Sequence, residues 1–237
     1  MATELKELID KLTTAHSSNL KSIVLYGNAV EGEQLDGDTP KKVLIILNEI
    51  TPATLKAGQS VVEWWRKEGN PLPVYFTTEE IEDSSDVFPI EFIDMSRVRH
   101  VLYGQDPFDN LKIETHNLRH QLEYELRGKL IRLRSLYLPA AHNPNRLASL
   151  MADSLSSFVV LFRHVLEMLE VEVPAGRNAV LIKIADELHL DKKVFARLSE
   201  YAADEEVWLE SETNETFGAY LKLLEQVTEA VDERERQ

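Results

Sequence analysis

The sequence predicts an α/β domain followed by an all-helical bundle, and three observations carry this prediction. Short apolar runs at 22–26, 43–47 and 73–76 are bounded by turn-forming residues, as strands are. A polar loop at 31–39 separates the first run from the second, and helical patterns precede the first run and separate the second from the third. Strands and helices therefore alternate through the first half of the chain. From about residue 111 onward only helical spacing remains. We therefore expect two domains, 1–110 and 111–237.

The elements of the first half follow from local patterns. Leu5, Ile9 and Leu12 share one helical face and predict an opening helix. The run 43–47 is apolar throughout, which indicates a strand buried on both faces. A helix is expected over 55–67 and a shorter one beginning with Thr78 as its cap. Two further strands are expected at 90–93 and 98–103.

In the second half, apolar residues recur at helical spacing in five segments. These segments begin near Leu118, Leu147, Val180, Val194 and Phe217. Each carries one apolar stripe wide enough for packing in a bundle.

Composition narrows the classes of function. The net charge of −15 disfavours broad binding of nucleic acid, because an acidic chain repels the phosphate backbone. The absence of cysteine excludes disulfides, thiolate catalysis and cysteine-ligated metal centres. The polar start of the chain and the lack of a run of about 20 apolar residues predict a soluble, cytoplasmic protein without a membrane partner.

One motif suggests a ligand. The apolar run 23–26 delivers the chain to Gly27, and Asn28 follows at an expected helix start. Glycine lets the backbone approach a ligand closely, and the N–H groups of a helix start attract anions. Gly27 and Asn28 are therefore candidate phosphate-binding residues.

This motif resembles the nucleotidyltransferase superfamily, which includes aminoglycoside-modifying and small antitoxin-type members. The first motif of that family is a strand, Gly-Ser and a short helix, and Gly27-Asn28 is similar to it with Asn in place of Ser. The resemblance extends to 118–126, which is similar to the first helix of the bundle that often follows such domains. It implies a mixed sheet in the first domain. It also implies two magnesium ions, held by an Asp-x-Asp pair on the second strand and a carboxylate on a later strand.

The sequence departs from the family at the metal ligands. Pro40 and Lys42 occupy the places of the two aspartates; proline has no ligand atom, and a lysine ammonium repels Mg²⁺. Glu91, within the strand-like segment 87–94, is the candidate for the third carboxylate. Asp36 and Asp38 precede the expected position and could be displaced metal ligands, although a solvated turn is the better explanation of them.

Three functions remain open. The first is a catalytically inactive binding or regulatory protein that holds a nucleotide through Gly27, Asn28 and Lys42, or a protein partner. The second is an active nucleotidyltransferase, with Mg²⁺ and a nucleoside triphosphate bound through Glu91, Asp36 and Asp38, that transfers a nucleoside monophosphate to a hydroxyl of a small molecule or a protein. The third is an oligomerisation module, which apolar stripes left exposed after folding would favour. The basic residues between Arg119 and Arg134 could meet a triphosphate, or form a solvated face paired with Glu123 and Glu125.

Overall fold

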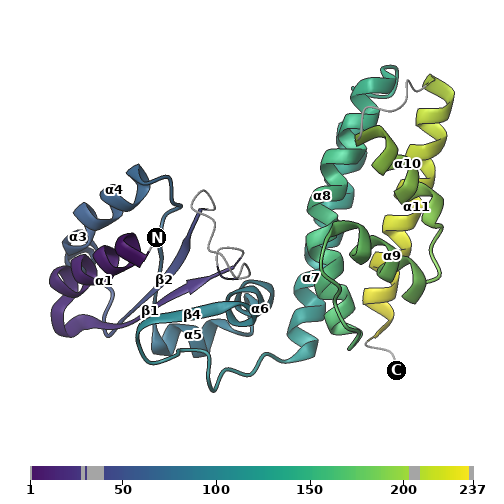
Figure 1. Cartoon of the computed structure of the whole chain (residues 1–237). Helices are drawn as coiled ribbons and strands as arrows, with labels where there is room; N and C mark the ends of the chain where they lie inside the picture. Colours follow the sequence, from purple (N-terminus) through teal and green to yellow (C-terminus); the bar gives the residue numbers. More distant parts are fainter. Residues whose placement is uncertain (1, 28–29, 31–39, 203–208, 235–237) are drawn as a thin grey trace. The chain divides into compact units, whose positions relative to one another are not determined.

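The computed structural model describes residues 2–27, 30, 40–202 and 209–234. The chain divides into two compact units, Met1–Glu114 and Thr115–Gln237, here called unit 1 and unit 2 (Figure 1). Unit 1 contains a sheet with helices, and the regular elements among the described residues of unit 2 are all helices. The predicted fold class is therefore confirmed.

The sheet of unit 1 is mixed and has four strands among the described residues. Its strands are β1 (Leu20–Tyr26), β2 (Lys42–Leu47), β3 (Val74–Thr77) and β4 (Arg99–Gly104), in the spatial order β3-β2-β1-β4. β1 pairs antiparallel with both β2 and β4, and β2 pairs parallel with β3. The last strand in sequence therefore lies beside the first.

Both faces of this sheet are covered, which explains the unbroken apolar character of β1 and β2. Successive residues of a strand point to opposite faces. Ile23 and Ile45 belong to a core that includes Trp65 and the leucines of the first helix, whereas Val24 and Leu44 belong to a second core with Phe92. The first core lies under α1 (Ala2–His16) and α4 (Gln59–Lys67), and the second under α5 (Thr78–Ser84) and α6 (Pro89–Arg97).

The helices of unit 1 differ from prediction in two details. The helix expected over 55–67 is two helices, α3 (Pro52–Ala57) and α4, which meet at Gly58. The cap of α5 is Thr77 rather than Thr78: the Thr77 side chain accepts from the Glu80 N–H, and Glu80 accepts from the Thr77 N–H. A 3-10 turn, Ser17–Asn19, joins α1 to β1.

The strand predicted at 90–93 is wrong, because these residues form the first half of α6. Pro89 occupies the first turn of this helix, where its missing N–H costs nothing, and Glu91 follows at the favourable end of the helix dipole. The alternation of Ile90 and Phe92 with Glu91 that suggested a strand covers too few residues to distinguish the two structures.

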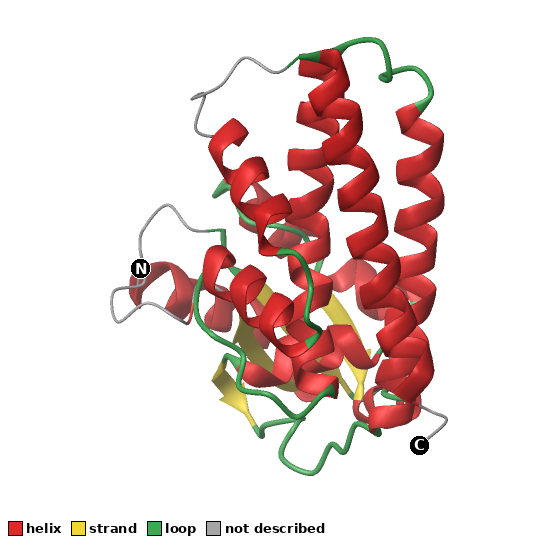
Figure 2. Cartoon of the chain, turned by 90° about the vertical axis from the view of Figure 1, so that its right-hand side faces the viewer, coloured by secondary structure: helices red, strands yellow, loops and turns green. Residues whose placement is uncertain are grey.

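Unit 2 consists of α7 (Thr115–Tyr137), α8 (Pro144–Met168), α9 (Arg177–Glu187), α10 (Lys192–Ala202) and α11 (Glu210–Glu233). The long helices α7, α8 and α11 run alongside one another, and α9 and α10 complete the bundle (Figure 2). The five predicted helical stripes are confirmed.

Helix α8 is long and apolar enough to cross a membrane by length and composition alone. Half of its most apolar window is buried inside the structure, and Leu155, Phe158 and Phe162 are enclosed by the other helices. The core helix of a bundle has the same properties, so its apolar character is accounted for by packing.

Candidate functional site

Three side chains form a row at the end of the sheet where β1 finishes. Tyr26 lies opposite Lys42 of β2 on one side and opposite Arg99 of β4 on the other. Directly opposed residues of neighbouring strands share a face, so the three side chains stand on the same side of the sheet. Tyr26 is half-buried, and burial raises the pKa of its phenol. The row therefore places one cationic group on each side of a neutral phenol ring.

Gly27 follows this row and adopts a backbone conformation with φ of 78°, which disfavours any residue with a side chain. A Cβ at Gly27 would lie 3.9 Å from Cδ of Lys42, so the lysine stem runs past the turn. The Gly27 N–H donates to Val98 O at 2.9 Å, and Val30 N–H donates to Gly27 O at 2.8 Å. Because its N–H is already bonded, Gly27 shapes the turn rather than donating to an anion.

Arg99, the third member of the row, is held by carboxylates. Its Nε lies 2.8 and 3.0 Å from the two Asp106 oxygens, and Asp109 Oδ1 lies 3.8 Å from Nη2. Its guanidinium also donates to Ser96 O and lies over the Phe108 ring. No ion pair or hydrogen bond to Lys42 is found among the described residues, and its side chain is exposed. Lys42 is thus the exposed cation of the row.

The start of β2 is anchored on the opposite face of the sheet. The buried Lys41 ammonium lies 3.0 Å from Glu4 Oε2 on α1. Asn70 completes this cluster: its Oδ1 accepts from the Lys41 N–H and its Nδ2 donates to Glu4 Oε1, both at 2.9 Å. Lys41 and Lys42 are neighbours with opposite roles, one buried in a closed network and one facing solvent.

The predicted site residues are only partly brought together. Gly27 and Lys42 lie side by side, and Pro40 is exposed just before β2. Asn28, Asp36 and Asp38 lie outside the described residues. Glu91 is exposed in the first turn of α6. The other end of this helix, at Arg97, is the end that leads toward Gly27, and Glu91 lies about 9 Å from it along the helix axis. Arg99 was missed, because only the pairing of β4 with β1 shows that it belongs to the row.

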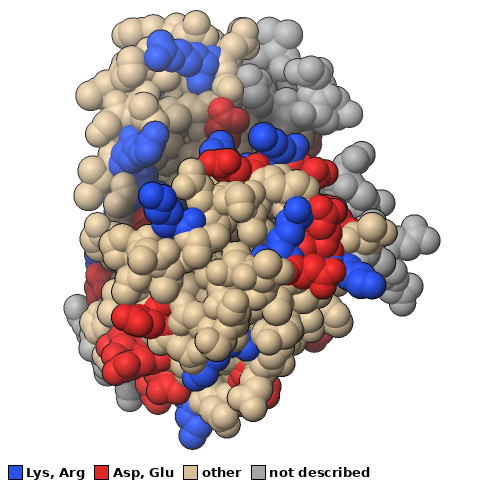
Figure 3. Space-filling model, turned by 90° about the vertical axis from the view of Figure 1, so that its left-hand side faces the viewer, with Lys and Arg blue, Asp and Glu red and all other residues tan. Residues whose placement is uncertain are grey.

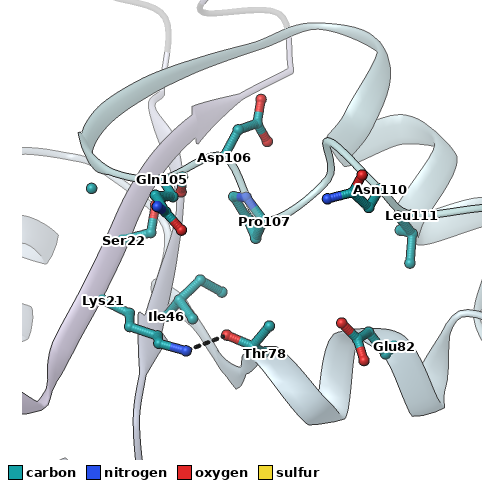
Figure 4. Close-up of a pocket in the computed structure, with 11 residues that line it drawn as sticks. Lys21, Ser22, Ile46, Thr78, Glu82, Gln105, Asp106, Pro107, Asn110 and Leu111 are labelled. Atoms are coloured by element: carbon teal, nitrogen blue, oxygen red, sulfur yellow. Dashed lines mark hydrogen bonds between the residues drawn. The ribbon is translucent and has the colours of Figure 1, made fainter.

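A pocket of about 490 Å³ lies at the other end of the sheet (Figure 4). Lys21 and Thr78 stand on one side, with Lys21 Nζ 3.3 Å from Thr78 Oγ1, and Gln105 and Asn110 stand on the other. The glycine at its edge, Gly104, has φ of 78°, and a Cβ there would lie 1.9 Å from Lys21 O. None of the candidate site residues of the sequence lines this pocket.

Basic residues are distributed among acidic ones. In the view of Figure 3, the lysine and arginine side chains of the described residues are scattered and form no continuous basic surface. On α7, Arg119 and Arg127 both pair with Glu123, at 3.1 and 2.7 Å, and Arg134 pairs with Glu225 at 2.7 Å. These three arginines of α7 thus have carboxylate partners, as expected for a solvated face.

No protein-family model and no curated protein sequence matches the chain. The fold of the chain, an α/β domain followed by a helical bundle, is nevertheless like that of a nucleotidyltransferase of known structure. Seven chains of solved structures are similar to this one. One is spectinomycin adenyltransferase AAD(9) from Enterococcus faecialis, determined with ATP and spectinomycin. The likeness covers 94% of this chain and 99% of that one, with a TM-score of 0.53 and 13% identity, which is evidence for the fold alone.

Proposed function

We propose that this protein is a catalytically inactive, cytoplasmic member of the nucleotidyltransferase-like fold that binds a nucleotide without transferring it and so acts as a sensor or regulator. The observation that carries the proposal is the row Lys42, Tyr26 and Arg99. In the family that the sequence resembles, carboxylates on the second strand and on a later strand hold two magnesium ions. Here Lys42 stands at the start of β2, where the resemblance implies an aspartate, and Arg99 stands at the start of β4 on the other side of Tyr26.

The described side chains of this row do not fit magnesium ions. Mg²⁺ takes oxygen ligands in a near-octahedral arrangement, and two cationic groups oppose its approach. They fit a polyphosphate better, because an ammonium is a phosphate ligand and supplies at the strand end the positive charge that metal ions supply elsewhere. Lys42 would contact the phosphates directly. Arg99, already held by Asp106, would contribute charge from a fixed position.

Calorimetric titration with each nucleoside triphosphate, with and without Mg²⁺, tests this proposal. We expect binding that does not require Mg²⁺, and a loss of about tenfold in affinity, about 1.4 kcal/mol, for Lys42→Ala. Lys56→Ala is the matched control: it removes the same charge from an exposed position on α3 and should leave the affinity unchanged.

Two outcomes would contradict the proposal. Binding that requires Mg²⁺, together with transfer of a nucleoside monophosphate, would establish an active enzyme and would direct mutagenesis to Asp36, Asp38 and Glu91 as the ligands. No binding of any triphosphate would leave the fold as a scaffold for a protein partner. Substitution of Asp36 and Asp38 by Asn distinguishes activity of this chain from that of a contaminating enzyme, because the substitution should abolish both the dependence of binding on Mg²⁺ and the transfer.

A further inference from the structure

The outer face of α7 carries an apolar stripe that the bundle leaves uncovered. Tyr124, Ile131 and Leu138 expose 78%, 62% and 76% of their surface. They stand seven residues apart: Tyr124 near the middle of α7, Ile131 in its second half and Leu138 just beyond its last residue. Positions seven apart on a helix lie nearly in line, which applies to Tyr124 and Ile131, about 10 Å apart along the axis. Leu138 continues the same spacing into the turn that follows the helix. An aligned group of large exposed apolar residues is typical of an interaction site.

This stripe is separate from the side of α7 that packs into the core of the bundle. The core-facing side of α7 is formed by a different set of leucines, all of them buried: Leu118, Leu122, Leu126, Leu130 and Leu133. On the outer side, Gly128 and Ser135 follow Tyr124 and Ile131 by four residues, which is one turn further along the same face. A Cβ at Gly128 would meet no atom within 4 Å. Small residues between large ones leave room for the side chains of a second helix.

The charges beside the stripe are balanced. A groove of about 410 Å³ lies beside Ile131, between α7 and α11, and its charged lining residues are two arginines and two glutamates: Arg127, Arg134, Glu225 and Glu229. The chain as a whole carries a net charge of −15, so most of its surface repels a second copy. This groove is a place where two copies can approach without like-charge repulsion.

The stripe is also symmetric about its centre. Ile131 lies seven residues from Tyr124 and seven from Leu138. A two-fold axis through Ile131 that pairs two α7 helices antiparallel would set Tyr124 of each copy against Leu138 of the other, and Ile131 against itself. A two-fold interface requires a patch of this kind, which is complementary to itself.

We infer that the outer face of α7, defined by Tyr124, Ile131 and Leu138, is the interface of a two-fold homodimer. A partner of different sequence could use the same apolar residues, but the balanced groove and the symmetry of the stripe favour a second copy of this chain.

Measurement of the mass in solution tests whether the dimer exists and whether this face forms it. We expect the full chain to be a dimer at micromolar concentration by sedimentation equilibrium. Ile131→Arg should halve the mass and leave the circular dichroism spectrum unchanged, because the side chain is exposed. Ile182→Arg, a substitution of another exposed isoleucine on α9, should remain dimeric and is the matched control.

The lack of cysteine in the chain permits a direct test of the symmetry. A cysteine introduced at Ile131 has no other thiol to meet, so under mild oxidation it should form a disulfide with the same residue of the second copy. Ile182→Cys should not. A monomeric wild-type chain would overturn the inference. So would a dimer that persists in Ile131→Arg and gives no disulfide through residue 131.

Discussion

The close approach of β1 and β4 at Gly104 predicts a large cost for a single methyl group. In Gly104→Ala, the new Cβ would lie 1.9 Å from Lys21 O and 3.0 Å from Lys21 C. Both neighbours are backbone atoms of the paired strand, so no side-chain rotation relieves the overlap. The strands must move apart, and an overpacked site of this kind costs about 1–3 kcal/mol. The left-handed backbone adds about 1–2 kcal/mol. We therefore expect a loss of about 2–5 kcal/mol in the free energy of unfolding of unit 1.

The matched control is Gly69→Ala, which separates the two contributions. Gly69 has φ of 86° but no atom within 4 Å of its Cβ position, so its substitution carries the backbone cost alone. Unfolding should be followed in urea by tryptophan fluorescence in a Trp208→Phe background. Only Trp64 and Trp65 of unit 1 then report, and unfolding of unit 2 does not contribute to the signal. Equal losses for the two alanine variants would refute the close contact of β1 with β4.

Three further predictions concern stability. Glu4→Ala should destabilise unit 1 by about 2–4 kcal/mol in urea titrations, because it leaves the buried Lys41 ammonium without its carboxylate. Glu7→Ala on the same helix removes an exposed ion pair and should cost less than about 1 kcal/mol. Burial lowers the pKa of His16 below its usual value of 6.5, so as the pH falls the unfolded chain takes up a proton before the folded chain does. The free energy of unfolding should therefore decrease as the pH drops through about 6.5, and His16→Leu should flatten this dependence between pH 7.5 and 5.5. Gly218→Ala, at an exposed helical position with no atom within 4 Å of its Cβ, should stabilise α11 by about 0.5–1 kcal/mol, detectable as a higher thermal midpoint of unit 2.

The strands that could be predicted are those with strong local patterns. The run 43–47 is apolar at every position because both faces of the sheet are covered, and burial of this kind is visible in the sequence. The segment 90–93 was assigned to the wrong structure, because a short apolar alternation is compatible with either period. Pro89 was the signal that favoured a helix.

Local sequence patterns could predict the residues of the candidate site that lie at strand ends, but not the pairing of strands that brings the site together. Gly27 and Lys42 were found because each lies at the end of a recognisable strand. Arg99 was not, because its position beside Tyr26 depends on the order of strands in the sheet. That order is set by contacts between residues far apart in the sequence, and no local pattern encodes it.

The pairing of the first strand with the last has a consequence for synthesis on the ribosome. β1 is complete at Tyr26, but its second neighbour ends at Gly104, so one edge of an apolar strand stays open while the intervening residues are made. At translation rates of about 5–20 residues per second, that interval is about 4–16 seconds. An open apolar edge is a template for pairing with other chains. The nascent chain is therefore exposed to mispairing with other chains during this interval, which ends before the first helix of unit 2 has been made.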